Sequence, residues 1–151
     1  LRDSFLAHYE DCMTDNTVTF DGVTAALEAL SDAGFRLAIC TNKPAAMSEV
    51  ILARLGLNRF FASVLGGDSL AVRKPDPAHL LEAIGRAGGT HDAAVMVGDS
   101  KTDVRAARNA RVPVVAVSFG YTRIAPAELG ADALIDHFDE LLPALSEMLV
   151  P

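Results

Sequence analysis

Residues 94–110 read AVMVGDSKTDVRAARNA and place a strand, a short connection and a helix in immediate succession. The run 94–97 is wholly apolar, which is typical of a strand covered on both faces of a sheet. A helix is expected from 101 to 110, with Asp99 just after the strand and Asp103 one turn into the helix. A spacing of four residues keeps two side chains on the same side of a helix. The segment therefore predicts two neighbouring carboxylates at the carboxyl end of a buried strand.

The same alternation of apolar strands and helices runs through the rest of the chain. Further strands are expected at 35–40, 63–65, 114–117 and 133–135. Helices are expected at 21–33, 44–55, 77–87 and 138–149, and the spacing of apolar side chains in 1–13 predicts another at the N-terminus. Asp76, followed by Pro77, is a typical helix start. Apolar strands separated by helices favour a doubly wound α/β fold, with a Rossmann-like parallel sheet and helices on both faces.

The composition of the 151 residues narrows the classes of protein. Half of the residues are hydrophobic and 22% are charged, which excludes an intrinsically disordered chain. No apolar run is long enough for a transmembrane helix. Asp and Glu number 20 against 13 Lys and Arg, so a general nucleic-acid-binding surface is not expected. Since the N-terminus carries no signal-peptide pattern, we expect a cytoplasmic protein that binds neither membranes nor nucleic acids.

Side chains suited to phosphate chemistry follow the strands at the edge where open α/β sheets bind ligands. Thr41 and Asn42 follow strand 35–40, Lys74 lies in the loop after strand 63–65, and Asp99 and Asp103 follow strand 94–97. A hydroxyl and an amide can hold phosphate oxygens, a lysine can balance their charge, and carboxylates can hold Mg²⁺. Singly, these residues are also typical of helix caps, a solvated loop lysine and acids at a helix N-terminus. Their gathering at one sheet edge favours a functional site.

The order and spacing of these motifs resemble the haloacid dehalogenase superfamily of phosphohydrolases, and its phosphoglycolate phosphatase branch in particular. LAICTNKP (37–44) resembles the family's second motif, a strand that ends in Thr or Ser. RKPDP (73–77) resembles its lysine motif, and VMVGDSKTD (95–103) resembles its G-D-x-x-x-D motif. SFGYT (118–122), ELGAD (128–132) and DHFDEL (136–141) are also similar to that branch, and the resemblance covers residues 20–149.

This resemblance implies a Mg²⁺-dependent phosphatase that hydrolyses a small phosphomonoester, such as 2-phosphoglycolate, through an aspartyl-phosphate. By position, Thr41 would hydrogen-bond the transferring phosphoryl group together with Asn42, and Lys74 would balance its charge. Asp99 would bind Mg²⁺, and Asp103 would orient Lys74 or a metal-bound water. The resemblance thus implies catalytic roles for Thr41, Lys74 and Asp103, phosphate contacts from Thr41, Asn42 and Lys74, and a metal ligand in Asp99.

One departure from the family pattern concerns the first motif, an apolar strand ending in D-x-D-G-[ST] that supplies the nucleophile. The nearest match is TFDGV (19–23), which has Thr19 at the nucleophile position. The resemblance then implies that residues 1–18 are the remnant of a helical cap domain and that 19–151 form an incomplete core without its usual central first strand. We therefore expect a part of a longer phosphatase, inactive alone, whose partner is the missing N-terminal segment or a second copy of the chain.

The sequence is also compatible with functions other than phosphoester hydrolysis. A catalytically silent descendant would bind phosphate or a partner without turnover, and a sugar phosphomutase would use the same motifs. A receiver domain fits less well, because its acidic pair would precede the Thr and the Lys. The remaining candidate residues are interpreted as structural: Cys40 as a small buried apolar side chain, and His8, His79, His91 and His137 as surface or helix residues.

Overall fold

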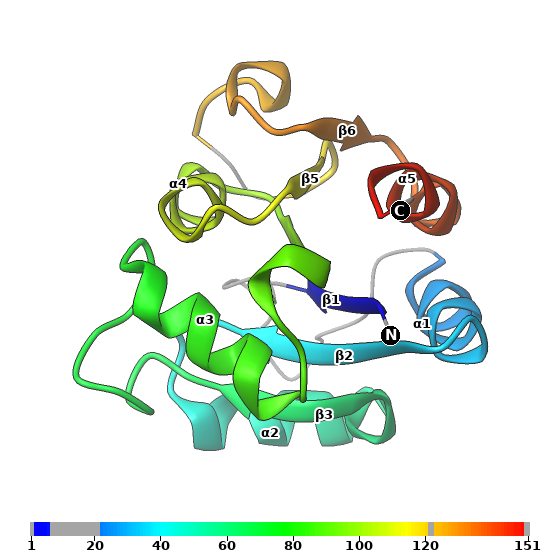
Figure 1. The fold of residues 1–151 in the computed structure, drawn as a ribbon. Helices are drawn as coiled ribbons and strands as arrows, with labels where there is room; N and C mark the ends of the chain where they lie inside the picture. Colours follow the sequence, from blue (N-terminus) through cyan, green and yellow to red (C-terminus); the bar gives the residue numbers. More distant parts are fainter. Residues whose placement is uncertain (1, 7–21, 121–122, 150–151) are drawn as a thin grey trace.

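The sheet is parallel and six-stranded, in the order β3-β2-β1-β4-β5-β6. The structure is a computed structural model that describes residues 2–6, 22–120 and 123–149, and it describes residues 2–6 by their backbone alone. Helices lie on both faces of the sheet (Figure 1). The predicted doubly wound α/β architecture is confirmed.

From Val23 onward, the helices and strands alternate as the apolar segments of the sequence predict. The strands are β1 (Arg2–Leu6), β2 (Phe35–Cys40), β3 (Phe61–Leu65), β4 (Ala94–Gly98), β5 (Val114–Val117) and β6 (Ala133–Ile135). The helices are α1 (Val23–Asp32), α2 (Ala45–Arg54), α3 (Pro77–Arg86), α4 (Lys101–Ala110) and α5 (Leu141–Met148). Short 3-10 turns, among them η2 (His91–Ala93) and η4 (Phe138–Glu140), precede β4 and α5.

The centre of the sheet is occupied by β1, which lies between β2 and β4. Ser4 is in register with Leu37 of β2 on one side and with Val95 of β4 on the other. The prediction of a helix over 1–13 is therefore wrong for Arg2–Leu6, and so is the expectation that the sheet lacks a central strand.

The reason for this difference is backbone hydrogen bonding. Without β1, β2 and β4 would each turn a row of N–H and C=O groups toward a gap, and unpaired buried backbone groups are costly. A strand in the gap pairs both rows at once, which a helix cannot do. Residues 7–13 lie outside the described part of the chain. Because Arg2–Leu6 belongs to the core sheet, the assignment of 1–18 to a cap domain stays a prediction only for the residues outside this strand.

Two apolar cores cover the two faces of the sheet. Because side chains alternate along a strand, Leu37 and Ile39 of β2 join one core while Ala38 and Cys40 join the other. The first core packs against α1, α2 and α5, and the second against α3 and α4. All four residues of β5 are buried, as expected for a strand covered on both sides.

The helix starts at the carboxyl edge confirm the capping signals in the sequence. The Asp76 side chain accepts a hydrogen bond from the backbone N–H of Ala78 at 2.8 Å, and α3 begins with Pro77. Helix α4 begins with a capping box between Ser100 and Asp103. Helix α2 begins at Ala45, with Pro44 at the capping position rather than in the first turn.

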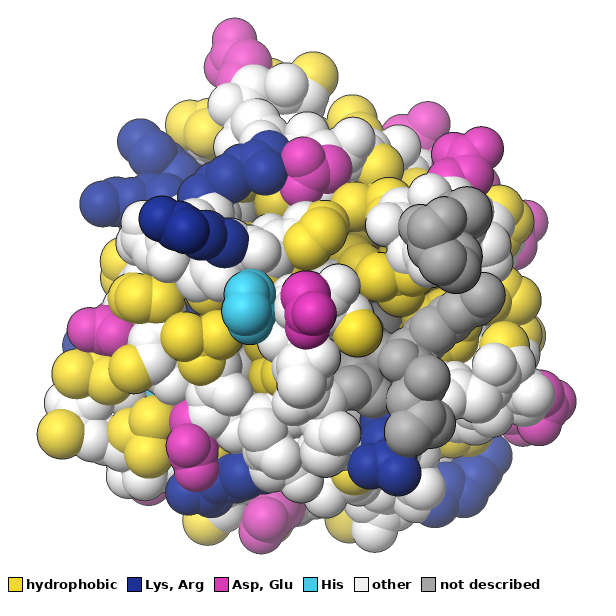
Figure 2. Space-filling model, viewed as in Figure 1, with side chains coloured by type: hydrophobic (Ala, Val, Ile, Leu, Met, Phe, Trp, Pro, Cys, Tyr) yellow, Lys and Arg dark blue, Asp and Glu magenta, His cyan; other side chains and the backbone are white. Residues whose placement is uncertain are grey.

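The surface shown in Figure 2 has Lys and Arg side chains gathered over α4, while acidic side chains are scattered. The exposed Arg108 of α4 donates to both carboxylate oxygens of Asp132 at 3.0 Å and to the carbonyl of Gly130 at 2.7 Å. This pair joins α4 to the segment before β6. Among the described residues, no helix is long and apolar enough to cross a membrane.

Candidate functional site

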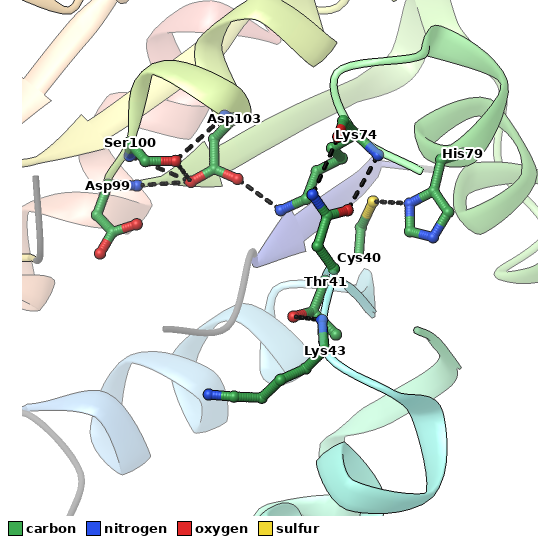
Figure 3. A network of polar contacts seen from close by, with 9 residues as sticks. Cys40, Thr41, Lys43, Lys74, His79, Asp99, Ser100 and Asp103 are labelled. Carbon is green, nitrogen blue, oxygen red and sulfur yellow. Dashed lines mark hydrogen bonds and ion pairs between the residues drawn. The ribbon is translucent and has the colours of Figure 1, made fainter. Parts of the chain in front are cut away.

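A chain of hydrogen bonds joins Asn42, Lys74, Asp103 and Asp99 at the carboxyl edge of the sheet (Figure 3). Asn42 lies in the loop after β2, Lys74 in the loop before α3, and the two aspartates at the junction of β4 and α4. The structure thus brings together the residues that the sequence placed at separate strand ends. Thr41, which precedes Asn42, begins the same loop.

Lys74 and Asp103 form a buried ion pair. Lys74 Nζ donates to Asp103 Oδ1 at 2.6 Å, and the residues are 6% and 3% exposed. Burial by itself would raise the pKa of Asp103, but the charge of Lys74 and hydrogen bonds from Lys74, Asp99 and Ser100 outweigh it and lower that pKa. Asp103 is therefore a carboxylate at neutral pH, and Lys74 is held as a charged ammonium within the site.

The second oxygen of Asp103 is also fully engaged. Oδ2 accepts hydrogen bonds from the backbone N–H of Asp99 at 3.0 Å, from the N–H of Ser100 at 3.2 Å and from the Ser100 hydroxyl at 3.0 Å. A Cβ at Gly98 would collide with the Asp103 side chain, so only glycine fits there. Asp103 thus contacts Lys74, and the orienting role that the resemblance implies stays a prediction.

Asn42 holds the backbone of Lys74 from the other side. Its Nδ2 donates to the Lys74 carbonyl and its Oδ1 accepts from the Lys74 N–H, both at 3.0 Å. The Lys74–Pro75 peptide bond that follows is cis. The sequence predicted that Asn42 binds phosphate, and this stays a prediction, since the contacts in the structure show a role in placing Lys74.

Thr41 is a buried hydroxyl next to this arrangement. It is 1% exposed, and its Oγ1 accepts a hydrogen bond from the Lys43 N–H at 3.2 Å. A hydroxyl that accepts one bond keeps its own O–H as a donor, which phosphate binding would require. The side chain of Lys43, also buried, extends away from His79 in the view of Figure 3. Lys43 is not among the site residues predicted from the sequence.

Asp99 is the described residue best placed to hold a cation. Its carboxylate points away from Asp103, on the left of Figure 3. The backbone of Gly120 lies so close to it that a Cβ there would collide with the Asp99 side chain. The described residues contain no cluster of three or more metal-binding side chains. Asp99 fits Mg²⁺, which is held by one or two carboxylates and keeps several waters.

Two functional candidates that sequence reasoning missed lie on the other side of Lys74. His79 of α3 is completely buried, and its ring nitrogens contact Cys40 Sγ at 3.2 Å and the Gly66 carbonyl at 2.7 Å. The prediction that Cys40 is buried is confirmed, and the thiol forms no disulfide. His79 is a helix residue, one of the two alternatives expected, but it is buried rather than on the surface. His79 precedes Ala83 by four residues, so the two side chains lie on the same face of α3, and that face is buried. This spacing is the sequence signal that indicates a buried His79.

Comparison with known proteins places these motifs in a family context. A family model described as haloacid dehalogenase-like hydrolase matches residues 1–117. The chain is 46% identical over 150 residues to a protein of Agrobacterium fabrum named phosphoglycolate phosphatase. That alignment covers 99% of this chain and 64% of the relative, so the chain spans somewhat less than two thirds of the relative's length.

Solved structures show the same fold. A protein of Haemophilus somnus described as a predicted phosphoglycolate phosphatase superposes with a TM-score of 0.79 at 36% identity, over 83% of this chain and 56% of that one. CbbY from Rhodobacter sphaeroides, solved in complex with phosphate, superposes with a TM-score of 0.73 at 28% identity, over 82% of this chain and 56% of that one.

Proposed function

This chain belongs to the haloacid dehalogenase-like hydrolase family, and from that premise we propose that it forms the phosphate-binding core of a phosphomonoester hydrolase. The proposed substrate is a small phosphomonoester such as 2-phosphoglycolate. Both the family match and the relatives named phosphoglycolate phosphatase support this reaction class. A cytoplasmic location is part of the same proposal.

The observation that carries the proposal is the buried Lys74–Asp103 pair beside Thr41. A lysine enclosed in protein keeps its charge only with a close anionic partner, and Asp103 is that partner at 2.6 Å. An ammonium fixed in this way is preorganised for the negative charge of a phosphoryl group. Asn42 restrains the backbone of the same lysine at 3.0 Å, so the position of the ammonium is determined from both ends of the residue.

In the proposed reaction, an aspartate carboxylate attacks phosphorus while the bond from phosphorus to the substrate oxygen breaks. The leaving oxygen takes a proton from a general acid and departs as an alcohol. Water then attacks the aspartyl-phosphate, which releases orthophosphate and a proton and regenerates the carboxylate. Thr41 donates a hydrogen bond to the phosphoryl oxygens, with Asn42 beside it, Lys74 balances their charge, and Asp103 keeps Lys74 aimed at them.

Mg²⁺ bound at Asp99 would neutralise charge on the phosphoryl oxygens and the attacking carboxylate. The nucleophilic aspartate is proposed to lie outside the 151 residues, because no D-x-D-G-[ST] segment occurs in them. The N-terminal segment of a longer protein would then complete the site.

A second candidate function is phosphate binding without hydrolysis. It is favoured by one sequence observation: the central strand β1 is followed by Ala7 and His8, neither of which is a carboxylate. In this case Thr41, Asn42 and Lys74 would still bind a phosphate group, and no phospho-enzyme would form.

The test is phosphate release from 2-phosphoglycolate, with and without Mg²⁺, by the complete gene product that contains this chain. Conversion of glucose 1-phosphate to glucose 6-phosphate is measured separately and reports phosphomutase activity, which releases no phosphate. The variant Lys74→Ala is expected to lose at least about 100-fold in kcat/KM, the scale for removing one electrostatic donor. Lys101→Ala, which removes an exposed lysine of α4, is the matched control and is expected to keep full activity. Orthophosphate binding with neither phosphate release from 2-phosphoglycolate nor isomerisation of glucose 1-phosphate would favour the silent binding protein.

A further inference from the structure

His79 is buried in the first turn of α3, five residues beyond Lys74, in a place where it cannot touch a substrate. Its exposed fraction is 0%, and in Figure 3 it lies across Lys74 from Asp99 and Asp103. A buried imidazole must have its polar atoms satisfied within the protein. Its contacts therefore indicate what the protein uses it for.

The two ring contacts specify a single tautomer. The Gly66 carbonyl can only accept a hydrogen bond, so His79 Nε2 must carry the proton and donate to it at 2.7 Å. Nδ1 is then the acceptor, and the Cys40 thiol donates to it at 3.2 Å. Burial raises the pKa of Cys40 to about 12, so that thiol keeps its proton. Burial also lowers the pKa of His79, which keeps the ring neutral as this arrangement requires.

These two bonds connect three segments that carry the phosphate site. Cys40 is the last residue of β2 and directly precedes Thr41. Gly66 begins the loop after β3, and the next residue, Gly67, donates its N–H to the Lys43 carbonyl at 2.7 Å. His79 itself belongs to the helix that follows the Lys74 loop.

The loop that begins at Gly66 packs directly on the backbone after Thr41. A Cβ at Gly66 would collide with the backbone of Ala45, and a Cβ at Gly67 would collide with the backbone of Asn42. Asp68 of the same loop accepts a hydrogen bond from the Ala45 N–H at 2.9 Å. The Gly66 carbonyl is thus a point through which a side chain of α3 can hold the Thr41–Asn42 segment.

We propose that His79 is a positioning residue of the phosphate site, acting through its Nε2–H bond to the Gly66 carbonyl. This bond ties α3, and with it the Lys74 loop, to the loop that packs on Thr41 and Asn42. The inference rests on the proposed phosphatase function, because its effect is the relative placement of Thr41 and Lys74. The bond to Cys40 satisfies the second ring nitrogen and is secondary.

The experiment separates the two ring contacts with a matched pair of variants in the complete gene product. Gln places a donor where Nε2 stands, so His79→Gln keeps the bond to Gly66 and loses the one to Cys40. Asn places an acceptor where Nδ1 stands, so His79→Asn keeps an acceptor for the Cys40 thiol and loses the hydrogen bond to the Gly66 carbonyl. Cys40→Ala removes the thiol alone, and His91→Asn repeats the His-to-Asn change at an exposed position.

The readouts are kcat and KM for 2-phosphoglycolate and the inhibition constant of inorganic phosphate. A fraction of unfolded enzyme lowers kcat but does not change an inhibition constant, so that constant reports on the site itself. His79→Asn is expected to raise the inhibition constant of inorganic phosphate about tenfold, within the range that a misplaced site residue produces. His79→Gln, Cys40→Ala and His91→Asn are expected to stay close to the unmodified protein.

Equal inhibition constants in the Asn and Gln variants, with the unmodified protein active, would overturn the inference and leave the phosphatase proposal intact. An increase in Cys40→Ala equal to that in His79→Asn would also overturn it, since the thiol would then be the important contact. An unmodified protein that neither hydrolyses the ester nor binds inorganic phosphate would overturn both the inference and the proposed function.

Discussion

Asn42 and Lys74 are 32 residues apart in the chain, yet the side-chain amide of one is bonded to both polar backbone groups of the other, each at 3.0 Å. This two-point contact joins the end of β2 to the loop before α3. It holds the Lys74 backbone through atoms other than the ammonium, which contacts Asp103. The site therefore combines the neutral hydrogen bonds of Asn42 with the buried charge pair of Lys74 and Asp103.

Removal of this contact is expected to affect both stability and activity. Asn42→Ala leaves the N–H and C=O of Lys74 without their partner, which costs about 1–3 kcal/mol of unfolding free energy for a buried polar group. We expect kcat/KM to fall at least about tenfold, because Lys74 loses its restraint. Urea denaturation and steady-state kinetics measure the two effects.

Asn109→Ala is the matched control for that variant. Asn109 donates to the carbonyl of the neighbouring Pro75 at 3.0 Å, but from an exposed position. Its loss is expected to change stability by less than about 0.5 kcal/mol, as for most surface substitutions. If both variants behaved alike, the two-point contact would have no special role.

The buried Lys74–Asp103 pair predicts a strong effect when one partner is removed. Asp103→Ala leaves the ammonium buried without its counter-charge, and breaking such a pair costs about 3–5 kcal/mol. The double variant Lys74→Met/Asp103→Leu is expected to recover much of this stability, while remaining inactive. Thermal or urea unfolding of the single and double variants tests the prediction.

An exposed pair in the same protein provides the comparison. Glu82→Ala breaks the i,i+4 contact with Arg86 at 2.9 Å and is expected to cost about 0.3–0.5 kcal/mol. If the double variant Lys74→Met/Asp103→Leu were no more stable than Asp103→Ala, the stability lost in Asp103→Ala would not come from the unpaired Lys74 ammonium.

The pH dependence of stability should carry a contribution from His79. Because the pKa of His79 in the folded protein lies below its ordinary value of 6.5, the unfolded chain binds the proton at higher pH than the folded one. Its contribution is therefore complete above that value and is lost as pH falls through 6.5 toward the folded pKa. Urea denaturation between pH 5 and pH 8, both about one to two units from the ordinary pKa, measures this slope.

His79→Gln is expected to flatten that part of the stability curve, because glutamine does not titrate. His91→Gln leaves His79 in place and is expected to keep the original slope. If His79→Gln left the curve of stability against pH unchanged, the pKa of His79 would be the same in the folded protein as in the unfolded chain.

The contact between Gly120 and Asp99 predicts a specific effect on magnesium. A methyl group in Gly120→Ala would displace the Asp99 side chain, so we expect the Mg²⁺ concentration for half-maximal activity to rise about 10-fold or more, as for changes that reorient a metal ligand. Removal of the metal with a chelator is expected to abolish turnover. A magnesium titration of the activity checks both.

Gly85→Ala is the matched control for a glycine-to-alanine change. Nothing lies within 4 Å of a Cβ at this position, which is on the exposed side of α3. Its magnesium requirement should be unchanged, and its helix should gain up to about 1 kcal/mol. If Gly120→Ala and the unmodified protein gave equal magnesium titrations, the assignment of Asp99 as the metal ligand would be wrong.

Much of the fold could be predicted because its signals are local. Apolar runs without polar alternation indicated buried parallel strands, and Asp76 before Pro77 indicated where α3 begins. The gathering of Thr41, Asn42, Lys74, Asp99 and Asp103 was predictable too, since strands of a parallel sheet end at the same edge. These inferences require only a few neighbouring residues and the topology rules of α/β sheets.

What only the tertiary structure decided depends on partners far away in the chain. The N-terminal segment has helical spacing of apolar residues, yet Arg2–Leu6 is a strand, because backbone groups of β2 and β4 are available to pair on both sides of it. The amide of Asn42 is directed to Lys74, and the ring of His79 to Cys40 and Gly66, by the packing of α3 on the sheet. Local sequence thus determined the elements and the edge where the site forms, and hydrogen bonding between distant segments decided which atoms meet there.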